Sequence, residues 1–140
     1  MSAVLLDTNI LVYAYIGDTN DPRVIRARQV LEESAREQTG RLGVQNLAEF
    51  CSVCLTKAKP PPSAEQLVQW VGELTSVFAV LSPTAETVAV ALRGVKEHRL
   101  SFWDAMLWAL AHENGVRRIA SEDFQHELIL EGVSFHNPFR

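Results

Sequence analysis

The sequence predicts an α/β protein in which helices cover both faces of a parallel β-sheet. Short apolar segments alternate along the chain with longer segments of helical periodicity. The first apolar segment, residues 4–6, ends abruptly at Asp7, and a second follows at residues 10–16. Strands buried on both faces read as continuous apolar runs, and strands that alternate with helices form parallel sheets. At 140 residues the chain suits one domain spanning residues 1–140.

Capping and breaking signals delimit the helices of the first half of the chain. Residues 8–16 form the first expected helix, which directly follows Asp7. Asp21 and Pro22 suit the start of a helix over residues 21–38, because Asp caps helices and Pro fits their first turn. A third helix over residues 45–58 is followed at once by Lys59 and three consecutive prolines, which break it.

The second half of the chain predicts three more helices. Residues 63–66 resemble a capping box, which opens one of them. Pro83 begins a helix that runs to about residue 98, and Gly115 ends a nearly all-apolar helix over residues 102–114, which we expect to be central and buried. The helix over residues 83–98 is expected to face the core with a stripe of five apolar residues: Ala85, Val88, Ala89, Leu92 and Val95. The expected strands are residues 4–6, 42–44, 77–81, 118–120 and 133–135.

Cysteine and tryptophan side chains are interpreted as core residues. Cys51 and Cys54 lie on one apolar helix face, and no second cysteine pair is present to complete a metal site. Trp70, Trp103 and Trp108 are also expected in the core rather than as base-stacking platforms. The prediction is weakest for Trp103, because it precedes an acidic residue.

Bulk properties narrow the classes of function. A net charge of −4 argues against a broad basic surface that binds nucleic acid by counterion release. It is compatible with an acidic site that binds phosphate through divalent cations. No apolar run is long enough to span a membrane, and no basic residue precedes the first apolar run as in a signal peptide. With two cysteines and no disulfide framework, we expect a cytoplasmic protein.

Four carboxylates lie next to apolar segments and are expected at one edge of the sheet. Asp7 and Asp123 follow predicted strands, while Asp104 and Glu49 lie on helices that pack against them. The carboxyl edge of a parallel sheet is where open α/β folds place their sites. Each acid also has a local interpretation, such as a helix cap for Asp7 or a capping box of Ser101 with Asp104.

Together the four carboxylates predict a divalent metal site. Carboxylates that gather at one edge repel each other unless a cation joins them. Ligation by oxygen alone favours Mg²⁺ or Mn²⁺ over zinc. Such ions lower the pKa of a bound water and neutralise charge that develops on a phosphate. Asn9, Ser121 and Thr8 are candidates to orient a carboxylate, a water or a phosphate. A local capping role is the alternative for each, and it is slightly stronger for Thr8 than for the other two.

Four short motifs resemble those of PIN-domain ribonucleases, and specifically of VapC-type toxins from toxin–antitoxin pairs. The motifs lie at residues 6–11, 46–50, 102–106 and 121–124, in this order, and the end of the chain at residues 132–139 is also similar. The resemblance implies a three-layer α/β/α fold with a five-stranded parallel sheet of order 3-2-1-4-5. It implies Mg²⁺- or Mn²⁺-dependent cleavage of RNA, with Asp7, Glu49, Asp104 and Asp123 as the acidic quartet. It also implies a homodimer and inhibition by a cognate antitoxin protein.

Other functions remain open at this point. A haloacid-dehalogenase-like phosphatase also places an Asp after its first strand, but it needs a second Asp where this chain has Asn9. A response-regulator receiver needs an acidic pair after that strand, which is not evident. A non-catalytic PIN-like module that binds RNA or protein is the third alternative, and the complete quartet argues against it.

Overall fold

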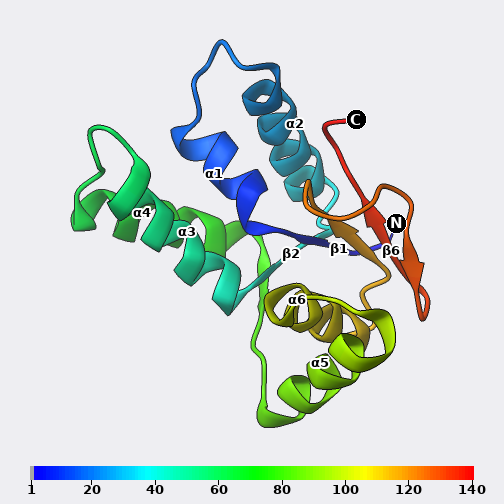
Figure 1. The fold of residues 1–140 in the computed structure, drawn as a ribbon. Helices are drawn as coiled ribbons and strands as arrows, with labels where there is room; N and C mark the ends of the chain where they lie inside the picture. The colour runs from blue at the N-terminus through cyan, green and yellow to red at the C-terminus, as the bar shows by residue number, and fades with distance from the viewer. Residues whose placement is uncertain (1) are drawn as a thin grey trace.

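A six-stranded sheet forms the centre of the computed structural model, which describes residues 2–140 (Figure 1). Its strand order is β3-β2-β1-β4-β6-β5, and all neighbouring strands are parallel except β5 and β6. The strands are β1 (Val4–Leu6), β2 (Gly40–Gly43), β3 (Ala79–Leu81), β4 (Arg118–Ala120), β5 (Ile129–Leu130) and β6 (Val133–His136).

The predicted α/β class and strand order 3-2-1-4-5 are confirmed, with β6 as the predicted fifth strand. Strand β5 was not predicted, because it has only two residues and pairs with β6 through a tight turn at Glu131 and Gly132. Several predicted boundaries are shifted by one or two residues, most clearly those of β2 and β3. Strand β2 ends at Gly43, since Val44 already begins a helix, and β3 starts at Ala79, since the preceding helix continues through Val77.

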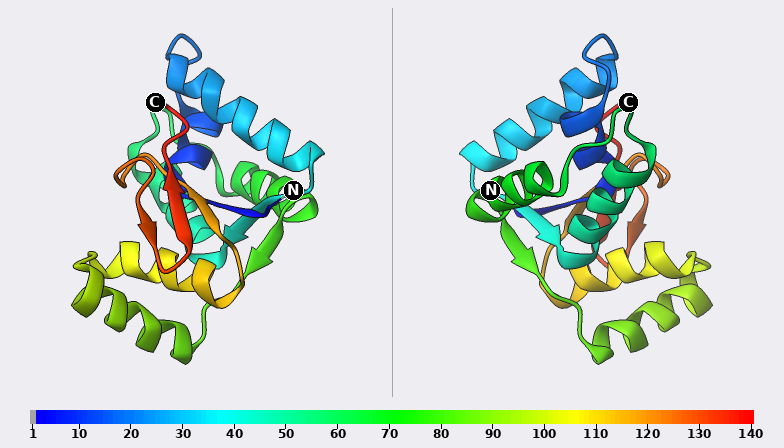
Figure 2. Two further views of the ribbon diagram at one scale, coloured as in Figure 1. Left: turned by 90° about the vertical axis from the view of Figure 1, so that its right-hand side faces the viewer. Right: turned by 90° about the vertical axis from the view of Figure 1, so that its left-hand side faces the viewer.

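Helices cover both faces of this sheet, so the fold has three layers (Figure 2). They are α1 (Thr8–Ile16), α2 (Pro22–Arg36), α3 (Val44–Lys57), α4 (Ala64–Val77), α5 (Ala85–His98) and α6 (Phe102–Glu113). Alternate residues of the central strands point to opposite layers, as strand geometry requires. Leu6 and Ala120 pack in the core formed with α1–α4, while Leu5 and Ile119 pack in the core that contains α6.

Helix α5 packs with a different face from the predicted one. The predicted stripe is exposed, with Leu92 at 55% and Val88 at 38% of full exposure. The buried positions are instead Thr87, Ala91 and Gly94, which face α6. A Cβ added at Gly94 would lie 2.9 Å from the Trp108 ring, so the two helices approach too closely for large side chains. The prediction was therefore wrong because close helix packing selected small residues over apolar ones.

Both cysteines and two of the three tryptophans pack in or against the core, as predicted. Cys54 is fully buried and Cys51 packs against the same core, which confirms the structural interpretation of both thiols. Trp108 is fully buried, and Trp70 packs against Phe50 and Tyr15. In residues 2–140, no helix has the length and apolarity needed to cross a membrane.

We expect Gly94→Val to destabilise the protein by about 1–3 kcal/mol, because the new side chain must displace the Trp108 ring from a fully packed site. Gly72→Ala is the matched control on the exposed surface of α4, where an added Cβ meets no atom within 4 Å. It should be neutral or stabilising by up to about 1 kcal/mol. Urea denaturation measures both, and equal effects would contradict close packing of α5 on α6.

Candidate active site

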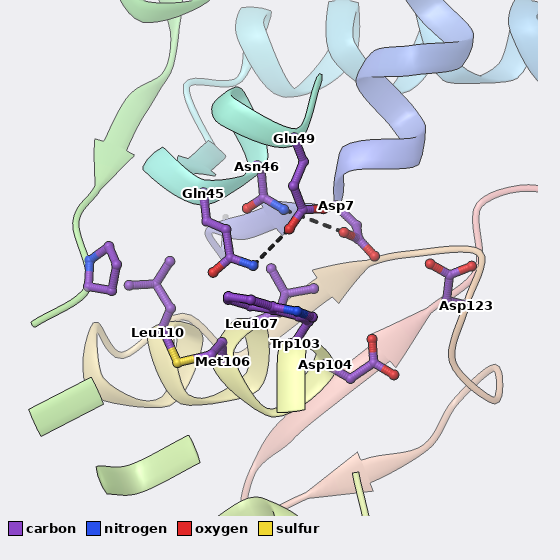
Figure 3. Close-up of a pocket in the computed structure, with 11 residues that line it drawn as sticks. Asp7, Gln45, Asn46, Glu49, Trp103, Asp104, Met106, Leu107, Leu110 and Asp123 are labelled. Atoms are coloured by element: carbon purple, nitrogen blue, oxygen red, sulfur yellow. Dashed lines mark hydrogen bonds between the residues drawn. The ribbon is translucent and has the colours of Figure 1, made fainter. Parts of the chain in front are cut away.

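A cleft of about 90 Å³ lies beyond the carboxyl ends of the central strands (Figure 3). All four predicted carboxylates line it, and they come from four different parts of the chain. Figure 3 shows the carboxyl groups of Asp7, Asp104 and Asp123 around one open space, with Glu49 on α3 above them. The remaining lining residues are Gln45, Asn46, Pro83, Trp103, Met106, Leu107 and Leu110.

Asp7 is held where β1 ends and α1 begins. Its backbone N–H donates to the Ala120 carbonyl at 3.0 Å, which extends the pairing of β1 with β4. Its carboxylate accepts the Thr8 N–H at 2.7 Å, the Ser121 hydroxyl at 2.6 Å and the Asn46 amide at 3.4 Å. Asp7 is thus the N-cap of α1 and also lines the cleft, so its capping role does not exclude it from the candidate site.

Burial raises the pKa of Asp7 to about 6 from its ordinary value of 3.8. The hydrogen bonds from Ser121 and the Thr8 N–H lower this pKa and only partly offset the burial. The negative charges of Asp123 and Glu49 raise it further. The surroundings of Asp7 therefore favour its protonated form over its ionised form.

Glu49 projects from α3 and is fixed by two donors. Gln45, one turn earlier on the same helix, donates its amide to Oε1 at 2.7 Å. The Thr8 hydroxyl donates to Oε2 at 3.2 Å and accepts the Asn46 amide at 3.0 Å. Thr8 therefore connects α1 to α3 and contacts a candidate carboxylate through its hydroxyl, rather than capping its own helix with it.

Asp104 and Asp123 lie on the opposite side of the cleft from α3 (Figure 3). Asp104 is in the first turn of α6, and its N–H donates to the capping hydroxyl of Ser101 at 3.4 Å. Asp123 follows β4, where its N–H donates to the Ser121 hydroxyl at 3.1 Å and its carboxylate accepts the Asn9 amide at 3.4 Å. Burial raises the pKa of Asp123, and the charge of Asp104 adds to the shift. Ser121 and Asn9 thus orient acidic residues, as the sequence predicted.

The residues of the cleft fit a hard divalent cation. Their ionisable donors are all carboxylate oxygens, which suit Mg²⁺ or Mn²⁺. Burial raises the pKa of Asp7 and of Asp123, and neighbouring carboxylates raise it further; a bound cation would favour the ionised form of both. Asn9 Oδ1 is buried and has no hydrogen-bond partner within residues 2–140, so it remains available to a water or an ion.

A second group of potential ligands lies away from this cleft. Within residues 2–140, only Glu97, His98 and Glu131 bring three ligand atoms within 4.8 Å of one another. The Arg93 guanidinium donates to both carboxylates of this group, so its positive charge stands where a metal ion would otherwise be needed. It also holds the pKa of Glu131 at about 2, with the His98 hydrogen bond as the next largest cause. The cluster is therefore an ion-pair network between α5 and the β5–β6 turn.

Sequence reasoning missed several lining residues. Gln45 and Asn46 were not among the candidate site residues, although a polar pair one turn before a candidate acid was an available signal. Trp103 was predicted to be in the core, and this was wrong, because its side chain is 61% exposed at the rim of α6. Its position on the second residue of a helix turns it away from the buried face that begins at Ala105.

The three-layer fold and its strand order are those of a PIN domain. The profile of the PIN domain family matches residues 4–129, which is most of the chain, and the chain belongs to this family. No curated protein matches the chain at a significant level.

Solved structures of VapC toxins share the fold. A toxin–antitoxin complex from Klebsiella pneumoniae matches with a TM-score of 0.69 at 17% identity, covering 97% of this chain and 98% of that one. DNA-bound VapBC from Salmonella typhimurium matches with a TM-score of 0.69 at 14% identity, covering 99% of both chains. VapC20 of Mycobacterium tuberculosis, described as a toxin that cleaves the sarcin-ricin loop, matches with a TM-score of 0.66 at 18% identity, covering 86% and 92%.

We expect Asp7→Asn to stabilise the metal-free protein at pH 8. Because folding raises the pKa of Asp7 to about 6, its favourable contribution is complete below about pH 4 and is lost as the pH rises through 6. Ionised Asp7 then destabilises the folded protein by about 3 kcal/mol, because folding raises its pKa from 3.8 to about 6. Urea denaturation in EDTA should show a gain of this order at pH 8 and a smaller gain at pH 5.

Asp104→Asn is the matched control for this prediction. Asp104 lies in the first turn of α6, where the helix dipole favours a negative charge by about 0.3–1 kcal/mol. Its substitution should therefore give little or no gain at pH 8. A gain for Asp7→Asn that is the same at pH 5 and pH 8 would contradict a buried, ionised carboxylate as its cause.

Proposed function

We propose that this protein is a Mg²⁺- or Mn²⁺-dependent endoribonuclease, with residues 1–140 as one domain, and the toxin of a toxin–antitoxin pair. The observation that carries the proposal is the convergence of Asp7, Glu49, Asp104 and Asp123 on one cleft at the carboxyl edge of a PIN-fold sheet. Membership of the PIN domain family and the fold shared with VapC toxins support it.

In the proposed mechanism Asp7, Asp104 and Asp123 hold the metal, and Glu49 completes the site. When bound, the metal supplies Lewis acidity, lowers the pKa of a water and neutralises phosphate charge. Ser121 fixes the Asp7 carboxylate and the backbone of Asp123 with one hydroxyl. Gln45 and Thr8 hold both oxygens of Glu49 in place, so that one of them can accept the proton of an attacking water.

The proposed partners are an RNA substrate, a cognate antitoxin protein and a second copy of the chain. One structural relative is described as cleaving the sarcin-ricin loop and another as a toxin–antitoxin complex, which supports the first two partners. The exposed stripe on α5, formed by Val88, Leu92 and Val95, supports the third. Apolar side chains that are adjacent on an exposed helix commonly mark a protein interface.

A phosphatase of the haloacid-dehalogenase type fits the site less well. That chemistry needs an acid two residues after Asp7, where this chain has Asn9. The Asn9 amide instead donates to Asp123 at 3.4 Å, which orients a carboxylate rather than protonating a leaving group.

The proposal is tested by RNA cleavage with the purified protein and Mn²⁺. We expect Asp7→Asn and Asp123→Asn to lower the cleavage rate by more than about a hundredfold, because each removes charge from the metal site. Glu65→Gln, on the exposed first turn of α4, is the matched control and should retain the wild-type rate. Wild-type cleavage by Asp7→Asn, or undiminished cleavage in excess EDTA, would contradict the proposal.

Metal binding has an independent readout in thermal stability. Mn²⁺ should raise the melting temperature of the wild-type protein, because an ion that binds only the folded state stabilises it by mass action. The shift should be strongly reduced in Asp7→Asn. Absence of any shift in the wild type at millimolar Mn²⁺ would overturn the metal assignment.

The dimer is tested with a charge on the α5 stripe. We expect Leu92→Glu to convert a dimer to a monomer in light-scattering measurements, because a carboxylate buried at an apolar interface is strongly unfavourable. Val68→Glu is the control, since Val68 is 73% exposed on α4 and outside the stripe. A dimer that survives Leu92→Glu would place the interface elsewhere.

A further inference from the structure

Trp103 is a large aromatic side chain that the fold leaves exposed beside the four carboxylates. Its side chain is 61% exposed, although Trp70 and Trp108 are packed in the two cores. Trp103 lines the same cleft as Asp7, Glu49, Asp104 and Asp123. Figure 3 shows its indole in the middle of the cleft, with Gln45 and Glu49 on one side and Asp104 on the other.

The cleft therefore has two chemically different walls. The carboxylates form one wall, which suits a cation and the phosphate that it binds. The second wall is apolar and is formed by Trp103 with Pro83, Met106, Leu107 and Leu110. A ligand that matches both walls carries a negative charge and a flat apolar group within a few ångströms of each other.

A nucleotide has this combination, because its phosphate is anionic and its base has an apolar face. Phe102 contacts Trp103 edge-to-face, with ring centroids 5.0 Å apart and an interplanar angle of 70°. This contact packs the indole against a neighbouring ring, while most of the Trp103 surface stays exposed. Stacking does not depend on net charge, so it can operate on a protein with a net charge of −4.

We propose that Trp103 stacks on one unpaired base of the RNA substrate and thereby positions the neighbouring phosphate at the carboxylates. This inference rests on the proposed function and adds the residue that holds one base of the substrate beside the cleavage point. The bases of a duplex already stack on each other, so a base must be unpaired and splayed out to reach the indole. Trp103 is a binding residue in this scheme.

The binding step is tested without catalysis. We use the Asp7→Asn protein and titrate it with an unstructured RNA octamer while recording tryptophan fluorescence. We expect quenching by the octamer and much less by the same strand in a duplex or by an abasic sugar–phosphate chain of equal length. In the double variant with Trp103→Phe the quenching should disappear, because Trp70 and Trp108 are packed in the cores.

The kinetic test separates binding from chemistry. For cleavage of a single-stranded substrate with Mn²⁺, Trp103→Ala should raise KM by about tenfold or more, within the range expected for the loss of one stacked base. The value of kcat should change much less, and Trp103→Phe should restore most of the affinity. Val68→Ala removes an exposed apolar side chain outside the cleft and should leave KM unchanged. The melting temperature of Trp103→Ala should match that of the wild type, because the ring is exposed.

The outcomes distinguish this inference from the proposed function. Octamer binding that needs Trp103, in a wild-type protein that cleaves no RNA, would support stacking and refute the nuclease. Metal-dependent cleavage with an unchanged KM in Trp103→Ala would support the nuclease and overturn stacking. Equal binding of the octamer and the abasic chain, or reduced affinity for a protein partner alone in Trp103→Ala, would also overturn it.

Discussion

The structure of the site depends on how a carboxylate is held at the end of a buried strand. Asp7 must be satisfied by hydrogen bonds, because an unpaired buried charge is strongly unfavourable. The Ser121 hydroxyl supplies one of these bonds at 2.6 Å, from the carboxyl end of the neighbouring parallel strand β4. The same oxygen accepts the N–H of Asp123, so one side chain sets the positions of two acidic residues. This arrangement ties β1, β4 and the loop after β4 together at the cleft.

Satisfying Asp7 in this way does not neutralise it. Burial raises the pKa of Asp7 to about 6 despite its hydrogen bonds, and neighbouring carboxylates contribute in the same direction. The ionised form of Asp7 is therefore unfavourable in the fold without a cation, mainly because the side chain is buried. Carboxylates with raised pKa values beside a cavity are characteristic of active sites, and a bound cation would favour their ionised form. The stability of the fold favours the protonated form of Asp7, whereas the proposed activity needs the ionised form.

Local and functional roles coincide at several positions. Asp7 caps α1, and Asp104 occupies the first turn of α6, while both also line the cleft. A helix start at the carboxyl edge of a parallel sheet needs an acceptor for its free N–H groups, and a cation site there needs carboxylates. One acidic side chain meets both needs, which is why capping signals in the sequence did not exclude a catalytic role.

The sequence by itself determined the class of fold, because strand lengths and abrupt charges at strand ends are local features. The family motifs gave the strand order. Together, the local features and the motifs pointed to the four acidic residues. Tertiary structure decided which face of α5 is buried, since Gly94 meets the Trp108 ring and the apolar stripe is left outside. It also decided that Thr8 contacts Glu49 and that Trp103 enters the cleft. Periodicity identifies an apolar face, but only the partner helix and its distance determine which face is buried.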